Sequence, residues 1–195
     1  YQQLYGEIIP IPADRVIVVE DGQRLTFGHR TFEFVDAPGH ARHHHCPVDL
    51  DHREVYSGDN FGICYREFDT ERGPFMLPTT TPVQFEPEAL LASIDRLLAY
   101  LPAAMILTHY SRVTEIGRLA ADLQRETGEL VALGRREDGK RDRAARLRAG
   151  VEELVLGWAR DHGARPSGER VRELLALDVE LNAQGLEAWL DRDRR

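Results

Sequence analysis

Residues 36–45 read DAPGHARHHH, a stretch that joins a Pro-Gly turn to four of the chain's eight histidines. Residues 31–35, directly before it, have the β-branched and aromatic composition of a strand. Pro38 and Gly39 favour a turn where that strand stops, which would hold the imidazole of His40 at the strand end. Imidazole is the commonest protein ligand for zinc and related divalent metals, so His40 is a candidate metal ligand.

Two more polar side chains occupy equivalent places further along the chain. Asp59 follows a Ser-Gly turn after Val55 and Tyr56, and His109 follows the apolar run at residues 104–107. Each run has the composition of a short buried strand, and functional residues are often found where such strands end. Carboxylates complete metal sites built on imidazole, so the pattern predicts a metal site along one edge of a sheet.

The neighbouring histidines 43, 44 and 45 are a different case. Residues adjacent in an extended strand point to alternate faces, so all three imidazoles cannot reach one ion. We expect most of this cluster to be solvated or to support a site without binding metal.

Turn and loop signals organise the region around these histidines. Asp21 and Gly22 stand between two β-type runs, at residues 15–20 and 24–36, and predict a hairpin with its turn at this pair. Residues 61–85 contain three prolines and predict a long irregular loop, of the kind that often carries function.

Helical spacing dominates from Pro87 onward, and Pro87 itself suits a first helical turn. Leucines and Ile94 at helical spacing predict an amphipathic helix laid on a sheet. A second helix is expected to begin near Ile116 and stop near Gly128, before a strand at residues 130–133. Three helices are expected after that, one ending at His162-Gly163, one capped by Ser167, and a last one containing Leu186, Trp189 and Leu190.

The composition changes after Gly134, which predicts two units, residues 1–134 and a helical subdomain at 135–195. Residues 135–148 hold seven basic and three acidic side chains, whereas the whole chain of 195 residues carries a net charge of −8. The rest of the chain is therefore more acidic still, and this disfavours an extended path for nucleic-acid phosphates.

The composition also limits where the protein works. No run approaches the ~20 apolar residues of a membrane span, and the first ten residues lack the pattern of a signal peptide. We expect a cytoplasmic protein with no membrane partner. Cys46 and Cys64 are too few for a disulfide framework and are interpreted as reduced thiols.

Three motifs taken together resemble a known family: DAPGHARHHH, VYSGDNFG and ILTHYS, in this order and spacing. They are similar to the second half of the metallo-β-lactamase fold hydrolases, the superfamily that includes glyoxalase II. The resemblance covers roughly residues 15–133. It implies an α/β fold, namely half of a four-layer αββα sandwich in which a mixed sheet is covered by helices.

The resemblance also implies roles for the strand-end residues. His40 would bind one of two divalent metal ions, Asp59 would bridge both, and His109 would bind the second. His44 matches a frequent second histidine of the motif and would support the site. Zinc is the expected metal, with iron or manganese left open.

One departure from the family is as informative as the match. The motif HxHxDH, which supplies further ligands in the superfamily, is absent from this sequence. In the superfamily it lies in the first half of the fold, so it would precede Tyr1. We therefore expect that the first half of the sandwich is not contained in this sequence, and that one face of the sheet lacks its covering layer.

The activity implied by the resemblance is hydrolysis of a small ester, thioester, lactone or amide by a metal-bridging hydroxide. Tyr110 would donate a hydrogen bond to the oxyanion, and Tyr65, Arg66 and Thr80, together with the neighbouring threonines 79 and 81, would shape a substrate pocket.

Two other functions stay open. A di-iron redox enzyme of the same fold is the first. The second is a non-enzymatic interaction module that uses the Arg-rich segment and the helices of Trp158 and Trp189; these helices are also the expected contact of a homodimer.

Overall fold

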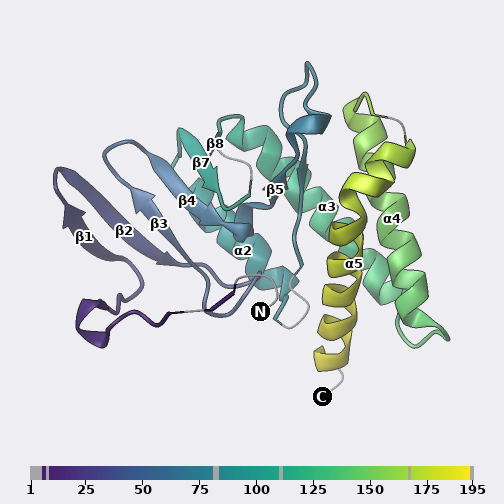
Figure 1. The fold of residues 1–195 in the computed structure, drawn as a ribbon, viewed down its shortest axis with the longest axis horizontal. Coiled ribbons are helices and arrows are strands. Elements are labelled where there is room, and N and C mark those ends of the chain that lie inside the picture. Colours follow the sequence, from purple (N-terminus) through teal and green to yellow (C-terminus); the bar gives the residue numbers. More distant parts are fainter. Residues whose placement is uncertain (1–5, 8, 81–83, 110–111, 167, 194–195) are drawn as a thin grey trace.

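A mixed six-stranded sheet with helices packed beside it forms the molecule (Figure 1). The computed structural model describes residues 6–7, 9–80, 84–109, 112–166 and 168–193. In sheet order the strands are β1 (Gln23–Phe27), β2 (Arg30–Asp36), β3 (His45–Asp49), β4 (Glu54–Gly58), β7 (Ala104–Leu107) and β8 (Arg112–Val113). The predicted α/β class with a mixed sheet is confirmed.

The strand directions bring three strand ends to one edge of the sheet. Strands β1 to β4 form an antiparallel meander, so β2 and β4 run in the same direction. Strand β7 pairs parallel with β4, with Gly58 opposite Leu107. The carboxyl ends of β2, β4 and β7 therefore share one edge, which is the placement expected from the sequence.

The first hairpin differs from the prediction. Its turn is at Gly28 and His29, between β1 and β2, and residues 16–20 form no strand. Gly28 has a φ of 63°, a left-handed conformation that suits a tight turn. A turn does form at Asp21 and Gly22, where the Gln23 N–H donates to the Glu20 carbonyl at 3.0 Å, but it leads into β1 and does not join two strands. The Asp21 carboxylate fixes this turn by accepting the backbone N–H of Asp36 at 2.8 Å.

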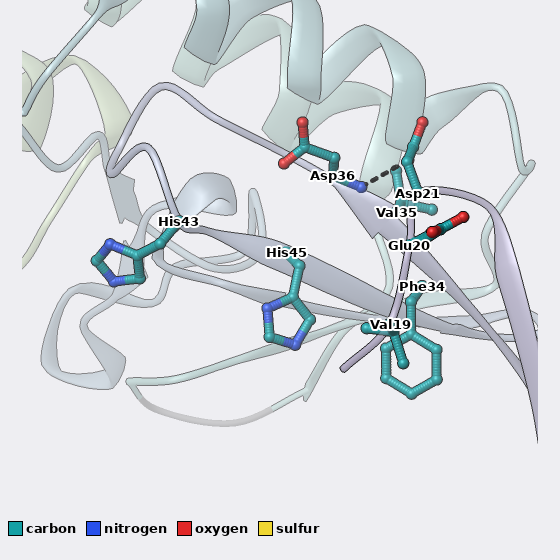
Figure 2. A pocket seen from close by; sticks show the side chains of 8 residues that line it. All are labelled: Val19, Glu20, Asp21, Phe34, Val35, Asp36, His43 and His45. Carbon is teal, nitrogen blue, oxygen red and sulfur yellow. Dashed lines mark hydrogen bonds between the residues drawn. The ribbon is translucent and has the colours of Figure 1, made fainter. Parts of the chain in front are cut away.

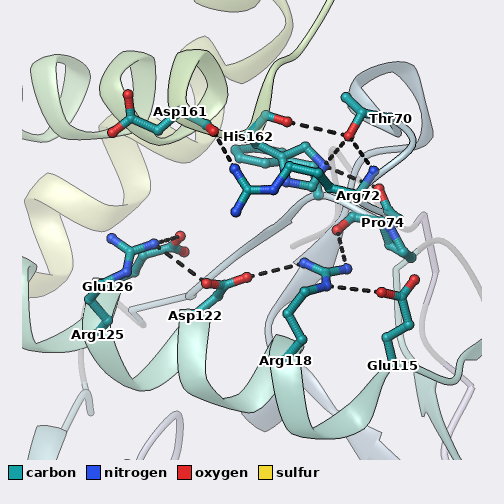
Figure 3. A network of polar contacts seen from close by, with 12 residues as sticks. Thr70, Arg72, Pro74, Glu115, Arg118, Asp122, Arg125, Glu126, Asp161 and His162 are labelled. Atoms are coloured by element: carbon teal, nitrogen blue, oxygen red, sulfur yellow. Dashed lines mark hydrogen bonds and ion pairs between the residues drawn. The ribbon is translucent and has the colours of Figure 1, made fainter.

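The proline-rich loop holds more order than expected. It contains two short paired strands, β5 (Ile63–Cys64) and β6 (Met76–Leu77), together with the 3-10 turns η2 (Asp59–Phe61) and η3 (Arg66–Phe68). Polar contacts tie it to the helices (Figure 3): Arg118 donates to the Pro74 carbonyl at 3.1 Å, and Thr70 lies 3.2 Å from the His162 ring. The loop is thus fixed to residues Arg118 and His162 of two different helices.

The helices are α2 (Pro87–Leu98), α3 (Ile116–Glu137), α4 (Arg143–His162) and α5 (Gly168–Asp193). The helix beginning at Pro87 is confirmed, and so is the helix ending at His162, where Gly163 is left-handed with a φ of 84°. The strand expected at residues 130–133 is wrong, because Leu130 and Leu133 continue the buried stripe of α3. Gly128 does not interrupt α3; it lies on the exposed side of the helix, where a Cβ would meet no atom of the described residues within 4 Å.

The chain's last two expected helices form a single one, α5. Ser167, the expected cap, falls outside the described residues. Helix α3 runs through residue 135 without a break, and its Leu133 packs against Gly150 of α4. The division into units 1–134 and 135–195 therefore falls within a helix and stays a prediction.

The two faces of the sheet differ in burial. Val35, Val48 and Val55 are fully or almost fully buried and join the core with the helices. Phe32, Phe34 and Tyr56 are only half-buried, and the Phe32 and Tyr56 rings lie 6.1 Å apart. In the part of the chain that the structure describes, no helix has both the length and the apolar character needed to cross a membrane.

Candidate metal centre

Three side chains predicted from strand ends meet at the carboxyl edge of the sheet. His40 Nε2 lies 3.5 Å from Asp59 Oδ2, and His109 Nε2 lies 3.6 Å from Asp59 Oδ1. Each carboxylate oxygen of Asp59 thus faces a different imidazole. The structure brings together His40, Asp59 and His109, which are up to 69 positions apart in the sequence.

The turn before His40 depends on a glycine. Gly39 has a φ of 130°, and a Cβ at this position would lie 2.2 Å from the backbone nitrogen of Leu90. No larger residue fits there, because the first turn of α2 packs directly on the Pro-Gly turn. Ser93 of the same helix donates its hydroxyl to the Pro38 carbonyl at 2.6 Å. Helix α2 therefore fixes where His40 leaves the strand.

Thr79, from the proline-rich loop, joins two of the three residues. Its hydroxyl donates to the Asp59 carbonyl oxygen at 3.0 Å and lies 3.0 Å from His40 Nδ1. Both ring nitrogens of His40 therefore have a neighbour, Thr79 at Nδ1 and Asp59 at Nε2.

His44 supports the same group from the opposite side. Its Nε2 accepts the backbone N–H of Asp59 at 3.3 Å, and its ring lies edge-on to His40 with 6.0 Å between centroids. Burial, reinforced by the neighbouring His40, lowers the pKa of His44 to about 4. Burial also lowers the pKa of His40, which the Asp59 carboxylate opposes. Neutral imidazole is the form that binds metal.

The residues present fit a pair of metal ions, and the strongest indication is a buried oxygen of Asp59. Asp59 Oδ1 is buried without a hydrogen-bond partner among the described residues. A buried carboxylate oxygen is normally satisfied by a donor or a cation. A metal ion between Asp59 Oδ1 and His109 would satisfy it, and a second ion would take Asp59 Oδ2 and His40.

The ligand set from this chain is nevertheless partial. Across the described ranges, no three His, Cys, Asp or Glu side chains are grouped to enclose one metal ion. Zinc in proteins takes about four ligands. Each of the two candidate metal positions would receive two ligand atoms from this chain, an imidazole nitrogen and a carboxylate oxygen.

The other predicted site residues have protein partners. The Tyr65 hydroxyl donates to Asp178 of α5 at 2.5 Å, and Arg66 pairs with Asp69 at 3.1 Å. Thr80 is buried and bonded to Asn182 of α5. Tyr110 and Thr81 lie outside the described residues.

Two residues of α5, Asp178 and Asn182, were missed by sequence reasoning. Both lie on a helix more than 100 positions after the loop that they bind. Burial raises the pKa of Asp178, and the Tyr65 hydroxyl and the charge of His109 oppose this shift. No local pattern in the sequence marks either residue.

A separate pocket of about 330 Å³ lies beside β2 and β3 (Figure 2). His43 and His45 line it together with Phe34 and Asp36. Of the three consecutive histidines, His44 is the one bonded to Asp59, while its two neighbours line this pocket.

Comparisons with known proteins bear on the family and the fold of the chain. The family model described as the Metallo-beta-lactamase superfamily matches residues 1–109. No curated protein matches the chain.

Several solved structures share the fold. An archaeal metallo-beta-lactamase superfamily protein from Sulfolobus tokodaii is 20% identical with a TM-score of 0.59, and the match covers 95% of this chain and 57% of that one. A beta-lactamase domain protein from Burkholderia ambifaria is 18% identical with a TM-score of 0.54, covering 96% and 50%. A metallo-beta-lactamase family protein from Thermus thermophilus is 16% identical with a TM-score of 0.52, covering 90% and 49%. The chain spans about half the length of these structures.

Proposed function

The chain belongs to the metallo-beta-lactamase superfamily, and from that premise we propose that it carries part of the active site of a metal-dependent hydrolase. The observation that supports this best is the placement of Asp59, whose two oxygens face His40 and His109 at 3.5 and 3.6 Å. A carboxylate between two imidazoles is the arrangement that would hold two divalent ions side by side. Zinc is the proposed metal, and nitrogen and oxygen ligands also suit iron and manganese.

When bound, two such ions supply Lewis acidity to a substrate carbonyl and activate a water molecule for its hydrolysis. The residues of this chain do the positioning. Asp59 would hold both ions, and its backbone is fixed by hydrogen bonds with His44 and Thr79. The lowered pKa of His40 keeps its imidazole neutral and able to bind a cation at neutral pH.

The proposed substrates are small acyl compounds, an ester, thioester, lactone or amide. The C-terminal arginines support this choice over a nucleic-acid or interaction role, because several are paired within the chain. Arg143 lies 2.8 Å from Asp191, Arg146 lies 2.5 Å from Glu137, and Arg148 lies 3.0 Å from Glu180. Basic groups neutralised in this way contribute little to phosphate binding.

The test is hydrolysis of one compound from each acyl class by the purified protein, together with its metal content. Asp59→Asn keeps the shape of the side chain but removes its charge, so we expect at least a 100-fold loss of activity and a loss of bound metal. Asp161→Asn is the matched control, because this aspartate is 75% exposed and far from the site in sequence.

Two results would contradict the proposal. One is hydrolysis by Asp59→Asn within twofold of the wild-type rate. The other is a protein that carries iron with visible absorption and consumes oxygen but hydrolyses none of the four classes, which would favour the redox alternative.

A further inference from the structure

Helix α5 docks onto the proline-rich loop through one face, formed by Asp178, Asn182 and Gly185. The Thr80 backbone N–H donates to Asn182 Oδ1 at 2.8 Å, and the Thr80 hydroxyl donates to the Asn182 carbonyl at 2.9 Å. Thr80 and Asn182 are each only 4% exposed. A Cβ at Gly185 would lie 2.2 Å from the Thr80 hydroxyl oxygen, so the helix and the loop are in direct contact.

Thr79, the residue next to Thr80, favours one of the two neutral forms of the His40 ring, through its hydroxyl and through a backbone hydrogen bond to the ring. A carbonyl oxygen only accepts hydrogen bonds, so the single hydroxyl hydrogen of Thr79 goes to the Asp59 carbonyl at 3.0 Å. The Thr79 oxygen therefore acts as the acceptor in its 3.0 Å contact with His40 Nδ1. The neutral ring then carries its proton on Nδ1 and its lone pair on Nε2.

This lone pair is on the nitrogen that faces the candidate metal position. His40 Nε2 is the atom 3.5 Å from Asp59 Oδ2. A neutral histidine binds metal through the nitrogen that carries no proton, and the partner of its other nitrogen determines which one that is. The opposite tautomer would direct an N–H group at the ion.

We infer that α5 holds His40 in this tautomer, in which the lone pair for a metal ion is on Nε2. Asn182 is a positioning residue that anchors Thr80. Thr80 in turn holds Thr79 against His40 and Asp59. The inference rests on the proposed function for the identity of the ligand, a divalent cation, but the tautomer itself is a property of the metal-free protein. Helix α5 thereby acts on the site although none of the proposed metal ligands lies on it.

The test reads the tautomer directly, by two-bond ¹H–¹⁵N NMR of the histidine rings in the metal-free protein at neutral pH. Wild-type His40 is expected to carry its proton on Nδ1. Thr79→Val removes the hydroxyl and should move the population toward the Nε2-protonated form, while Thr79→Ser should restore the wild-type spectrum. Asn182→Ala should shift the population in the same direction as Thr79→Val.

Zinc affinity, measured by calorimetry on the full chain, gives a second readout. Thr79→Val and Asn182→Ala should each raise the zinc Kd by about 10-fold, the lower end of the effect of losing a group that orients a metal ligand. Gln184→Ala is the matched control, because Gln184 is on the exposed side of α5 and its side chain donates to Glu180. Thr80→Val, which has the same shape and loses one link to Asn182, replaces Asn182→Ala if that variant does not fold.

The inference is overturned if wild-type His40 carries its proton on Nε2. It is also overturned if the folded Asn182 or Thr80 variant has the same tautomer and zinc Kd as Gln184→Ala. If the tautomer responds as expected but the wild-type chain binds no zinc, the inference stands and the proposed function fails.

Discussion

The backbone N–H of Asp59 donates to His44 Nε2 at 3.3 Å, which joins the carboxylate residue between His40 and His109 to the histidine cluster of the Pro-Gly-His motif. The contact is close because the residue before Asp59 has no side chain. Gly58 has a φ of 53°, and a Cβ there would lie 2.4 Å from His44 Nε2. The Ser-Gly-Asp motif therefore needs its glycine both for backbone conformation and for space.

Gly58→Ala is expected to destabilise the protein by about 2–4 kcal/mol, from left-handed strain together with overpacking against His44. Urea unfolding measures the change. Gly157→Ala is the control, because it lies inside α4, its Cβ would meet only the end of Arg160 at 3.8 Å, and alanine is favoured in a helix by about 0.5–1 kcal/mol. Equal stability of the two variants would contradict this account of Gly58.

The contribution of His44 to the stability of the protein should fall in mild acid. Its folded pKa of about 4 lies below the ordinary histidine value of 6.5, so between these two pH values the unfolded chain binds a proton that the folded one does not. The contribution of His44 is therefore present above pH 6.5 and is lost as the pH falls toward 4.

His44→Gln should flatten this acid dependence, since an amide oxygen can still accept the Asp59 N–H but does not titrate. Urea midpoints at several pH values test it, with His29→Gln in the exposed β1–β2 turn as the control. An unchanged pH profile in His44→Gln would show that His44 is not the titrating group.

Glu126 should have the opposite effect on stability between pH 4.5 and 8. This residue of α3 is 3% exposed, its Oε2 has no partner among the described residues, and burial raises its pKa to about 8 (Figure 3). The unfolded carboxyl loses its proton near pH 4.5, so the folded state loses stability as the pH rises from there to 8, by up to about 1.4 kcal/mol per pH unit.

Glu126→Gln is therefore expected to raise the unfolding temperature at pH 8 and to change it little at pH 4.5. Its neutral amide keeps an oxygen for Arg125, which lies 2.9 Å from Glu126 Oε1. Scanning calorimetry at the two pH values measures the difference. Glu129→Gln, one turn further on and also paired with Arg125, is the comparison, and an equal gain at both pH values would contradict a titrating Glu126.

The sequence allowed the strand ends to be predicted because short apolar runs followed by polar residues are local patterns. Asp59 and His109 follow such runs, and the parallel pairing of β4 and β7 brings them to one edge. The strand expected at residues 130–133 failed because four apolar or small residues in a row suit either a strand or a buried helix. Only the continuation of the stripe from Leu119 and Leu123 distinguishes the two.

The contacts made by α5 could not be predicted at all. Asn182 binds Thr80 across 102 positions, and nothing near either residue indicates the other. Long-range docking of this kind depends on how the helices pack, which no local period in the sequence encodes. The motif indicates the proposed ligands, whereas the groups that hold them in place come from distant parts of the chain.

The most direct test of the central claim is a zinc titration of the full chain followed by ¹H–¹³C NMR of the histidine rings. We expect the resonances of His40 and His109 to shift together, Asp59→Asn to abolish both shifts, and His29 and His52 to stay unchanged. Shifts confined to His43 and His45 in the separate pocket, with His40 and His109 unmoved, would contradict it.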